Sequence, residues 1–394
     1  MSLTASAMRF VWKHSSRRRF LKTLEQSEAL EATPLAGDDS FVESKTSDKS
    51  LQVRILDPVN DPGWDHVVAL HRDAGCFHTS AWAKVLHQTY HHQPFYLQFS
   101  RRRRLVALIP LMEVRSLFTG CRGVCLPFSD ACEPLIFDAA AMGFVKDRLL
   151  RFADERRWKH LEIRGSQSFQ VALGSGEKFY GHTLDLRSSA EELATRFASP
   201  VRRAIRKAER SGLKAVVARN RAAINDFYHL HAQTRRRHGL PPQPASFFLN
   251  IYEHIIKPGL GFIVLARRGS RPIAAAIFFR FGKNALYKYG ASDKRFQEFR
   301  ANNLVMWQGI QLLARGNAEK LHFGRTVCEN DGLRRFKLSW GTKEETINYF
   351  RVDPSGRKCL VAAPSDSGLH KKIFGMLPLA VNRLAGRMIY PHLD

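Results

Sequence analysis

The chain has 394 residues, and its 44% hydrophobic and 25% charged residues are typical of a soluble protein with buried cores, long enough for two domains. Lys and Arg number 62 against 36 Asp and Glu, so the formal net charge is +26, which favours partners that carry phosphate, such as nucleic acid, nucleotides or anionic lipid headgroups. No apolar run reaches the ~18 residues of a membrane-spanning helix, no apolar stretch follows the basic N-terminal residues as in a signal peptide, and the six cysteines lack zinc-site spacing, so the sequence predicts a cytoplasmic protein with reduced thiols and no metal site.

The first 187 residues divide into a tail and an α/β unit. Residues 1–50 change from basic to acidic and rich in Ser and Thr, with little apolar material, which predicts a disordered tail. Residues 51–187 predict an N-terminal unit. Its elements are the strand LQVRIL, a helix at 80–90, the strands FYLQFS and LVALIPLMEV joined by a charged RRRR turn, a helix at 139–157, and the strands HLEIRG and YGHTLDL.

Residues 188–353 repeat this theme at greater length. A helix starts at Ser199 and Pro200 and stops at Gly212, and two more follow at 222–238 and 245–256. The remaining elements are the strands GFIVLARR, PIAAAIFFRF and ALYKYGAS, a helix at 302–315, the strand KLHFG, a short basic helix and the strand TINYFRV. This order predicts an α/β (α+β) fold, in which mixed, mostly antiparallel sheets are flanked by helices, and an internal duplication of the first unit.

Residues 366–390 predict a basic amphipathic C-terminal helix. Its apolar stripe contains Ile373, Leu377, Val381, Leu384 and Met388, and lysines and arginines lie off the stripe. Two interpretations stay open: the helix lies on a membrane surface, or it docks on the second unit and closes its core.

The segment GRTVCENDGLRRFKLSWG, residues 324–341, is the strongest functional signal in the sequence. Glycine, arginine and lysine gather where a strand gives way to a helix and backbone amides are free. This pattern indicates a site for a phosphorylated or carbonyl-bearing ligand, and is equally typical of a solvated basic helix packed by Phe336 and Trp340. Lys337 is the candidate for stabilising an oxyanion or holding a donor phosphate, and the candidates for clamping phosphates are Arg325, Arg334 and Arg335.

Three further side chains are candidates for proton transfer. Alternation along the strand at 286–291 predicts Tyr287 and Tyr289 on one face, with Tyr289 as proton donor to a leaving group. Asp293, just after this strand, and His231, on the helix at 222–238, are candidate bases for an amine. The simpler interpretation is that the tyrosines are core aromatics and that His231 is a structural residue.

The helix at 201–210 is the most basic element of the chain. Its outer face predicts contact with a tRNA acceptor arm, a nucleotide-sugar pyrophosphate or a lipid headgroup, although charged faces are often only solvated. The candidate residues for binding an acceptor or phosphate are Arg202, Arg203 and Arg206, with Arg235 of the TRRR motif.

Several strings resemble the FemAB-like branch of the GNAT (Gcn5-related) acyltransferase superfamily, of the type associated with exopolysaccharide and exosortase systems. They are FHTSAWAKVLHQTYHHQPFYL, LIPLMEV and LPFSD in the first unit, and RRAIRKAERSGL, HAQTRRRHGLPPQP, YKYGASD, NNLVMWQGIQLLA, HFGRT, GLRRFKLSWGT and NYFRV in the second. The resemblance covers roughly residues 51–353. It implies tandem GNAT-like domains, with the catalytic site in residues 188–353.

The resemblance also carries expectations about the site. Fem-type enzymes move an aminoacyl group from charged tRNA to an amine, and related proteins use acyl-CoA. The pair Phe336–Lys337 matches the family position whose lysine stabilises the oxyanion and engages the donor. The turn that holds the CoA pyrophosphate in GNAT enzymes corresponds to QEFRANN, which makes Arg300, Asn302 and Asn303 candidate donor-binding residues. Asn303 and Val305 replace the glycines of that turn, which favours a donor other than acetyl-CoA.

The sequence therefore predicts an N-acyltransferase that acts on an amine of a cell-envelope or exopolysaccharide precursor, a small-molecule or lipid-linked saccharide or peptide. No cofactor is expected to be tightly bound; the donor substrate is acyl-CoA or aminoacyl-tRNA. One alternative is a Fem-type aminoacyltransferase that binds tRNA, and another is a non-catalytic basic scaffold that binds RNA. The predicted location is cytoplasmic, at the periphery of the inner membrane if the C-terminal helix binds lipid.

Overall fold

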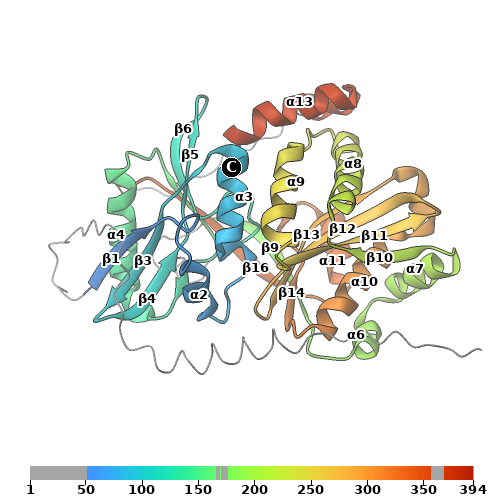
Figure 1. The fold of residues 1–394 in the computed structure, drawn as a ribbon, viewed down its shortest axis with the longest axis horizontal. Helices are drawn as coiled ribbons and strands as arrows, with labels where there is room; N and C mark the ends of the chain where they lie inside the picture. The colour runs from blue at the N-terminus through green and yellow to red at the C-terminus, as the bar shows by residue number, and fades with distance from the viewer. Residues whose placement is uncertain (1–50, 166–168, 170–175, 356–367, 394) are drawn as a thin grey trace, which may run out of the picture. The chain divides into compact units, whose positions relative to one another are not determined.

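The computed structural model describes residues 51–165, 169, 176–355 and 368–393 (Figure 1). The predicted tail at residues 1–50 lies outside this part of the chain. The described residues form two β-sheets with helices packed on them. The predicted α/β class, with mixed, mostly antiparallel sheets flanked by helices, is confirmed.

A four-stranded antiparallel sheet is built from the first part of the chain alone, in the order β1-β3-β4-β7. The RRRR segment forms the predicted turn between β3 and β4, with Arg102 and Arg103 in the left-handed region. The strands of this sheet are β1 (Leu51–Leu56), β3 (Tyr96–Arg101), β4 (Arg104–Ile109) and β7 (Leu135–Ile136).

The predicted strand LVALIPLMEV is two strands rather than one. Strand β4 ends at Ile109 and β5 (Met112–Ser116) begins beyond Pro110, because proline has no amide hydrogen to donate to a ladder. Here the chain leaves the small sheet and enters the large one, where β5 pairs with β2 (Gln93–Pro94) and β6 (Gly120–Val124).

The large sheet contains twelve strands in the described part of the chain. Their order is β10-β11-β12-β13-β14-β9-β16-β8-β6-β5-β2, and β15 pairs with β9. The strands not yet bounded are β8 (Leu161–Arg164), β9 (Glu177–Asp185), β10 (Lys214–Ala218), β11 (Gly261–Arg268), β12 (Arg271–Phe281), β13 (Asn284–Ser292), β14 (Lys320–His322), β15 (Thr326–Val327) and β16 (Lys343–Val352).

Two strands make this sheet continuous between the halves of the chain. Strand β9 lies between β14 and β16, and β16 also pairs with β8. The predicted division into residues 51–187 and 188–353 therefore stays a prediction, because the hydrogen-bonded ladder does not stop there. Continuity of the sheet places loops of the first half beside strand ends of the second.

Helices cover both faces of the sheet around β11–β13 (Figure 1). Strand β11 is apolar from Phe262 to Ala266 because Phe262 and Val264 face one core and Ile263 and Leu265 face the other. The first core includes α3 (Ser80–Tyr90), α8 (Arg221–Arg237) and α9 (Ala245–Ile251), and the second includes α6 (Ala190–Arg196), α7 (Ser199–Arg210) and α10 (Ala301–Arg315).

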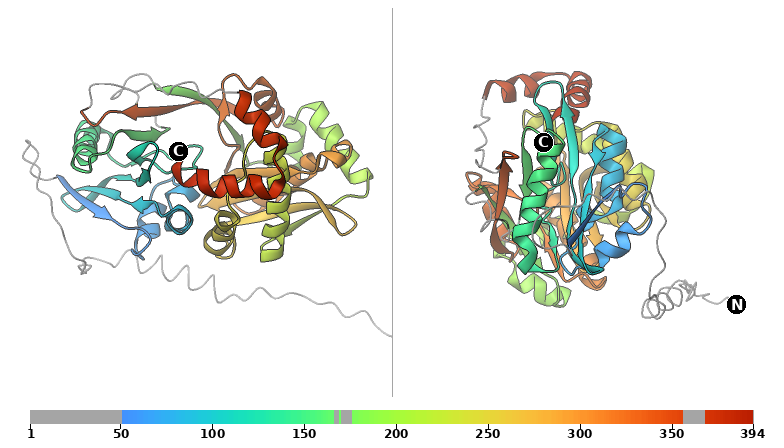
Figure 2. Two further views of the ribbon diagram at one scale, coloured as in Figure 1. Left: turned by 90° about the horizontal axis from the view of Figure 1, so that it is seen from above. Right: turned by 90° about the vertical axis from the view of Figure 1, so that its left-hand side faces the viewer.

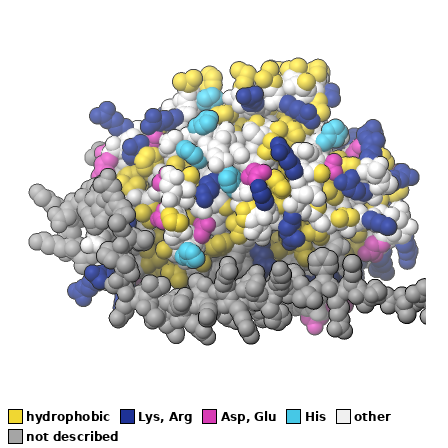
Figure 3. All heavy atoms as spheres, in the orientation of Figure 1, with side chains coloured by type: hydrophobic (Ala, Val, Ile, Leu, Met, Phe, Trp, Pro, Cys, Tyr) yellow, Lys and Arg dark blue, Asp and Glu magenta, His cyan; other side chains and the backbone are white. Residues whose placement is uncertain are grey.

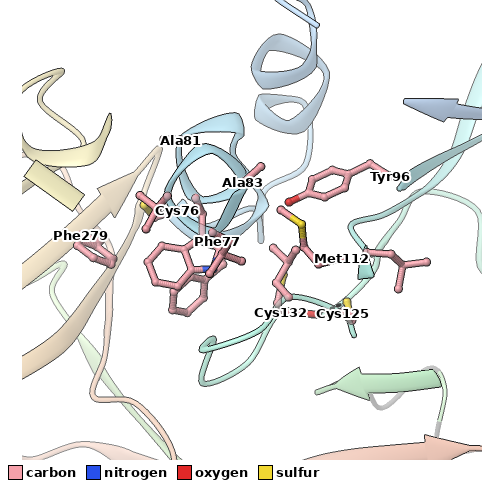
Figure 4. Packing of buried hydrophobic residues seen from close by; sticks show 14 of the residues in the cluster. Cys76, Phe77, Ala81, Ala83, Tyr96, Met112, Cys125, Cys132 and Phe279 are labelled. Carbon is pink, nitrogen blue, oxygen red and sulfur yellow. Dashed lines mark hydrogen bonds between the residues drawn. The ribbon is translucent and has the colours of Figure 1, made fainter. Parts of the chain in front are cut away.

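The first core continues from β12 into the first half of the chain. In Figure 4, Phe279 of β12 lies close to Cys76, Phe77 and Ala81. The Trp82 ring centroid lies 6.0 Å from that of Phe279. One apolar cluster therefore joins elements that are some 200 residues apart in sequence. In the described part of the first half, the other α-helices are α2 (Trp64–Ala69) and α4 (Met142–Glu155).

The predicted C-terminal helix at 366–390 is two helices, α12 (Gly368–Met376) and α13 (Leu379–Ile389). The break falls at Pro378, whose extended conformation caps α13 and whose ring cannot continue a helix. Both helices lie along one side of the molecule (Figure 2). Among the helices of the described residues, none is long and apolar enough to cross a membrane.

Candidate functional site

Strands β13 and β14 separate at the centre of the large sheet. They pair in parallel only where Asn284, Ala285 and Leu286 face Lys320, Leu321 and His322. Strand β13 then continues to Ser292 along β12, whereas the segment that follows β14 turns away at Gly324. The edge of β13 beyond Leu286 therefore has no pairing with β14, and we call it the open edge.

A β-bulge lies at the start of this open edge. Tyr289 pairs with Ile277 and Tyr287 with Phe278, so Lys288 is the extra residue. Tyr287 consequently packs on Phe278 of the second core, whereas Tyr289 joins the first core. The prediction that the two tyrosines share one face is wrong, because a bulge breaks the alternation on which it depended.

The bulge residue, Lys288, is paired with Asp130 of the first half. Its Nζ donates to Asp130 Oδ2 at 2.8 Å and to the Phe128 carbonyl at 2.6 Å, and its side chain is 7% exposed. Asp130 ends the LPFSD string, in which Leu126 and Phe128 adopt left-handed conformations that are costly for such residues. A strained loop held in place to present a carboxylate is typical of functional sites.

Asp130 is ionised in this setting. Burial acts to raise the pKa of Asp130, but the Lys288 ammonium outweighs it, and the pKa lies below its ordinary value. The Tyr349 hydroxyl donates to the Asp130 backbone carbonyl at 2.7 Å and fixes the loop. Oδ2 is bound to Lys288, while Oδ1 makes only a long contact, 3.4 Å, with the amide of Arg325. Oδ1 therefore has capacity to bind a cationic or amine group.

Lys337 holds the turn that passes over Asp130. It lies on α11 (Asp331–Leu338), is buried, and donates from Nζ to the carbonyls of Gly324 at 2.7 Å and Arg325 at 3.0 Å. Burial lowers the pKa of Lys337 to about 8, with the Asp130 charge opposing the shift. An ammonium has three donors, and the two carbonyls occupy two of them.

Gly324 has a structural reason to be glycine. Its φ is +74°, and a Cβ there would lie 3.1 Å from Asp130 Oδ1. We call Asp130, Lys288, Gly324, Arg325 and Lys337 the seam site. It joins both halves of the chain at the point where β13 and β14 separate, and it holds one carboxylate and two ammonium groups.

Two of the other basic residues of residues 324–341, Arg325 and Arg334, have partners of their own. Arg325 stacks on Phe179 and Tyr349, at 4.5 and 4.8 Å from the ring centroids. Arg334 binds Glu344 through two hydrogen bonds, and Phe336 packs near Trp340. Arg335 is exposed. Their predicted contacts with a donor stay predictions, and Arg334 would need to leave Glu344 to clamp a phosphate.

The two predicted bases lie in settings unsuited to proton abstraction. His231 is buried, donates from Nε2 to Gln243 Oε1 at 2.8 Å, and stacks on Phe227. Burial lowers the pKa of His231 to about 3. Asp293 caps a 3₁₀ turn and binds Arg295 and Arg271, and these hydrogen bonds hold its pKa below the ordinary value.

His231→Gln is expected to leave transfer close to the wild-type rate, because the side chain works as a buried, neutral packing group. The pKa of His231 is lower in the folded than in the unfolded state, so the unfolded chain is protonated first as the pH falls. The free energy of unfolding therefore decreases as the pH falls through 6.5 towards 3. The variant should therefore be less acid-sensitive than the wild type, measured by urea unfolding from pH 7 to pH 4. Loss of transfer in the folded variant would instead make His231 catalytic.

The predicted donor-binding residues lie at the start of α10. Arg300 precedes the helix at φ +56°, and no side chain caps this terminus. Asn302 donates to Ser292 Oγ at 3.2 Å, and the amide of Asn303 bonds to the Arg300 carbonyl. Arg300 thus adopts a left-handed conformation that glycine also tolerates. The prediction of a donor other than acetyl-CoA, which rests on Asn303 and Val305, stays a prediction.

The predicted acceptor-binding arginines do not act alike. Arg202 bonds to the carbonyls of Thr195 and Phe197 and closes α6, and Arg235 bonds to Tyr390 and Pro241 and anchors the C-terminus. Arg203 and Arg206 lie on the exposed face of α7. Only the latter pair is therefore presented to a phosphate-bearing partner.

Asp130 and Lys288 were not among the residues selected from sequence. Their strings, LPFSD and YKYGASD, carried the resemblance, but the two residues are 158 positions apart. A lysine between two tyrosines in a strand also gives no sign of a bulge.

Comparison with known proteins identifies the domain at residues 195–338 and the fold of the chain. Residues 195–338 match the profile of the acetyltransferase (GNAT) domain. FemX aligns at 14% identity over 75% of this chain and 96% of its own, with a TM-score of 0.62. A tandem GNAT protein from the clavulanic acid biosynthesis pathway aligns at 12% identity over 80% of this chain and 100% of its own, with a TM-score of 0.51. No curated protein matched. Residues 195–338 are therefore an acetyltransferase (GNAT) domain, and the fold of the chain is similar to those of FemX and of the tandem GNAT protein.

Proposed function

We propose that the seam site transfers an acyl group from an activated donor to an amine. One observation carries this proposal. At the open edge of β13, Asp130 is paired with Lys288 and lies beside the turn at Gly324 that Lys337 holds. A carboxylate orients an incoming amine, and ammonium groups stabilise the negative charge that develops on a carbonyl oxygen. Both kinds of group belong to the seam site, where Asp130 is bound directly to Lys288.

The reaction needs no enzyme-bound intermediate. The acyl carbonyl lies along the open edge of β13, and the amine lone pair attacks its carbon while Asp130 Oδ1 orients the N–H groups. The third N–H of Lys337 stabilises the resulting oxyanion. Collapse expels the donor's thiolate or alkoxide, which Tyr289 protonates, and the proton that the amine loses restores the tyrosine hydroxyl. Tyr289, at the edge of the first core, is the proposed source of a proton for the leaving group.

The proposed donor site is the N-terminus of α10. This helix has fifteen residues and no side-chain cap, so its first amides and its dipole favour a pyrophosphate. Arg300, Asn302 and Asn303 would surround that group. The conformation of Arg300 supports acyl-CoA as a donor, in spite of the missing glycines.

Calorimetric titration with acetyl-CoA tests this donor. We expect the wild type to bind, and both Arg300→Ala and Arg300→Gly to bind about tenfold more weakly, because both lose the guanidinium. Arg300→Gly is included because glycine tolerates the φ of +56° at this position. Arg315→Ala, at the other end of α10, is the control and should bind normally. Wild-type binding that neither Arg300 variant changes would remove Arg300 from the site.

The proposed acceptor is an amino group on a cell-envelope or exopolysaccharide precursor, either a small molecule or a lipid-linked saccharide or peptide. Its support is the Fem-type resemblance together with a cation-lined seam that suits a phosphorylated carrier. We place the reaction in the cytoplasm.

A Fem-type transfer from aminoacyl-tRNA is the second candidate. It is favoured by α7, which packs on α10 and exposes Arg203, Arg206, Lys207 and Arg210 on its outer face. Such a face binds a phosphate backbone in a strongly salt-dependent way. If acetyl-CoA does not bind but charged tRNA does, and Arg206→Gln with Arg210→Gln weakens that binding, the donor is tRNA.

A further inference from the structure

The C-terminal helix α13 packs on the protein with the side that carries Asn382 and Gly386. Asn382 is fully buried, and its side-chain amide donates to the carbonyls of Phe374 and Leu240. Gly386 packs so tightly on the loop before α9 that a Cβ there would lie 1.9 Å from the Pro242 carbonyl oxygen. An amphipathic helix that closes a core does the opposite and buries its apolar side.

The apolar stripe of these helices consequently faces outwards. Leu384 is 59% exposed, Met388 66% and Met376, at the end of α12, 73%, and Val381 is also exposed. The interpretation that the segment closes the core of the second half is therefore wrong for this stripe. Apolar side chains that share one exposed face mark an interaction site.

A second element presents apolar side chains beside the first. The tip of the β5–β6 hairpin carries Leu117, 94% exposed, and Phe118, 81% exposed. The Ser116 hydroxyl accepts the amides of Phe118 and Thr119, which fixes the turn. The Phe118 ring lies 5.0 Å from that of His392, just beyond α13. The hairpin tip and α13 lie on the same side of the molecule in Figures 1 and 2.

Basic side chains accompany both elements. Lys372 and Arg387 are exposed on the C-terminal helices, and Arg115 and Lys159 are exposed near the hairpin. In Figure 3, hydrophobic side chains follow the upper edge of the molecule with Lys and Arg between them. A shallow pocket opens where α8 meets α12, and its lining residues are Arg237, His238, Gly239, Lys372, Gly375 and Met376.

We infer that this surface, the apolar rim, is a docking surface for an anionic lipid bilayer. The rim comprises Leu117, Phe118, Met376, Val381, Leu384 and Met388. Its apolar side chains enter the boundary between the lipid headgroups and acyl chains, and the neighbouring Lys and Arg side chains contact lipid phosphates, as expected for a surface helix with basic flanks. The pocket of Arg237 and Lys372 receives a headgroup phosphate.

Charge decides between a bilayer and a second copy of the chain. The cations beside the rim complement an anionic surface, whereas a second copy would bring the same cations, and a chain of net charge +26, against each other. The inference is independent of the donor and of transfer itself.

Vesicle co-sedimentation of the full chain tests the inference. We expect the wild type to bind phosphatidylcholine vesicles that contain phosphatidylglycerol, and to bind pure phosphatidylcholine weakly. Two double variants, Leu117→Ser/Phe118→Ser and Leu384→Ser/Met388→Ser, should each weaken binding about tenfold or more, because each removes two inserted apolar side chains. These residues are exposed, so folding should be unchanged.

Matched control variants distinguish vesicle binding by the apolar rim from non-specific binding that depends only on the high positive charge of the protein. Leu70→Ser removes a comparably exposed apolar side chain elsewhere, and Arg104→Gln removes a cation from the β3–β4 turn; both should bind like the wild type. Lys372→Gln/Arg387→Gln should lose the preference for phosphatidylglycerol. Binding that the rim variants do not reduce, or no binding by the wild type, would overturn the inference, as would rim variants that only convert a dimer into a monomer.

Discussion

Asp130→Asn is expected to abolish detectable transfer and to destabilise the fold by about 3 kcal/mol. The substitution leaves the nearly buried Lys288 ammonium without its counter-ion, and breaking a buried pair from one side costs several kcal/mol. It also removes the charge on Oδ1 that orients the amine. Urea unfolding and the rate of transfer measure the two effects separately.

A double variant separates stability from chemistry at this pair. Asp130→Asn/Lys288→Met removes both charges and should recover most of the lost stability, because no unpaired charge stays buried. It should still fail to transfer. Asp185→Asn, which breaks the exposed pair with Arg187, is the control and should change stability by less than about 1 kcal/mol. An active double variant would show that Asp130 and Lys288 serve only the fold.

Replacing Lys337 should have the second largest effect. Lys337→Met leaves two inward-facing carbonyls, those of Gly324 and Arg325, without their donor, and removes the group proposed to stabilise the oxyanion. We expect transfer to fall on the order of 100-fold or more and stability to fall by about 1–3 kcal/mol. Lys178→Met, an exposed lysine on β9, is the matched control. A folded Lys337→Met protein with normal transfer would show that this lysine takes no part in catalysis.

The pH dependence of transfer follows from the same lysine. Its folded-state pKa is about 8, below the ordinary value of 10.5, so the ammonium is lost as the pH rises through about 8 and the rate should fall there. Stability should change in the opposite direction, because between pH 8 and 10.5 the unfolded chain holds more protons than the folded one. Lys337→Arg keeps its charge, and any residual activity should lack this high-pH decline.

The periodicity of apolar residues predicted the helices and strands whose buried faces can be recognised from neighbouring residues in the sequence. The helix expected at 80–90 is α3 (Ser80–Tyr90), and the continuous apolar runs GFIVLARR and PIAAAIFFRF are β11 and β12, buried on both faces. Lys337 was also selected from sequence, because a basic residue at a strand-to-helix junction has a local explanation.

Features that depend on distant contacts were not predictable in this way. The bulge at Lys288 reverses the faces of Tyr287 and Tyr289, and a single inserted residue leaves no periodic signal. The partnership of Lys288 with Asp130 arises only because β9 and β16 make the sheet continuous. The exposure of the apolar stripe of α13 was also not predictable, because Asn382 and Gly386 make the contacts with the protein in place of the apolar side chains.

The most direct test of the central claim is transfer itself. Labelled acetyl-CoA and labelled aminoacyl-tRNA would each be incubated with the protein and a panel of amines, comprising UDP-linked amino sugars, amino-terminated peptides and lipid-linked amino saccharides. The account predicts label on an amine with one of the two donors, lost in the double variant Asp130→Asn/Lys288→Met although that variant is folded. Label transferred equally well by the double variant, or no labelled amine with either donor, would contradict it.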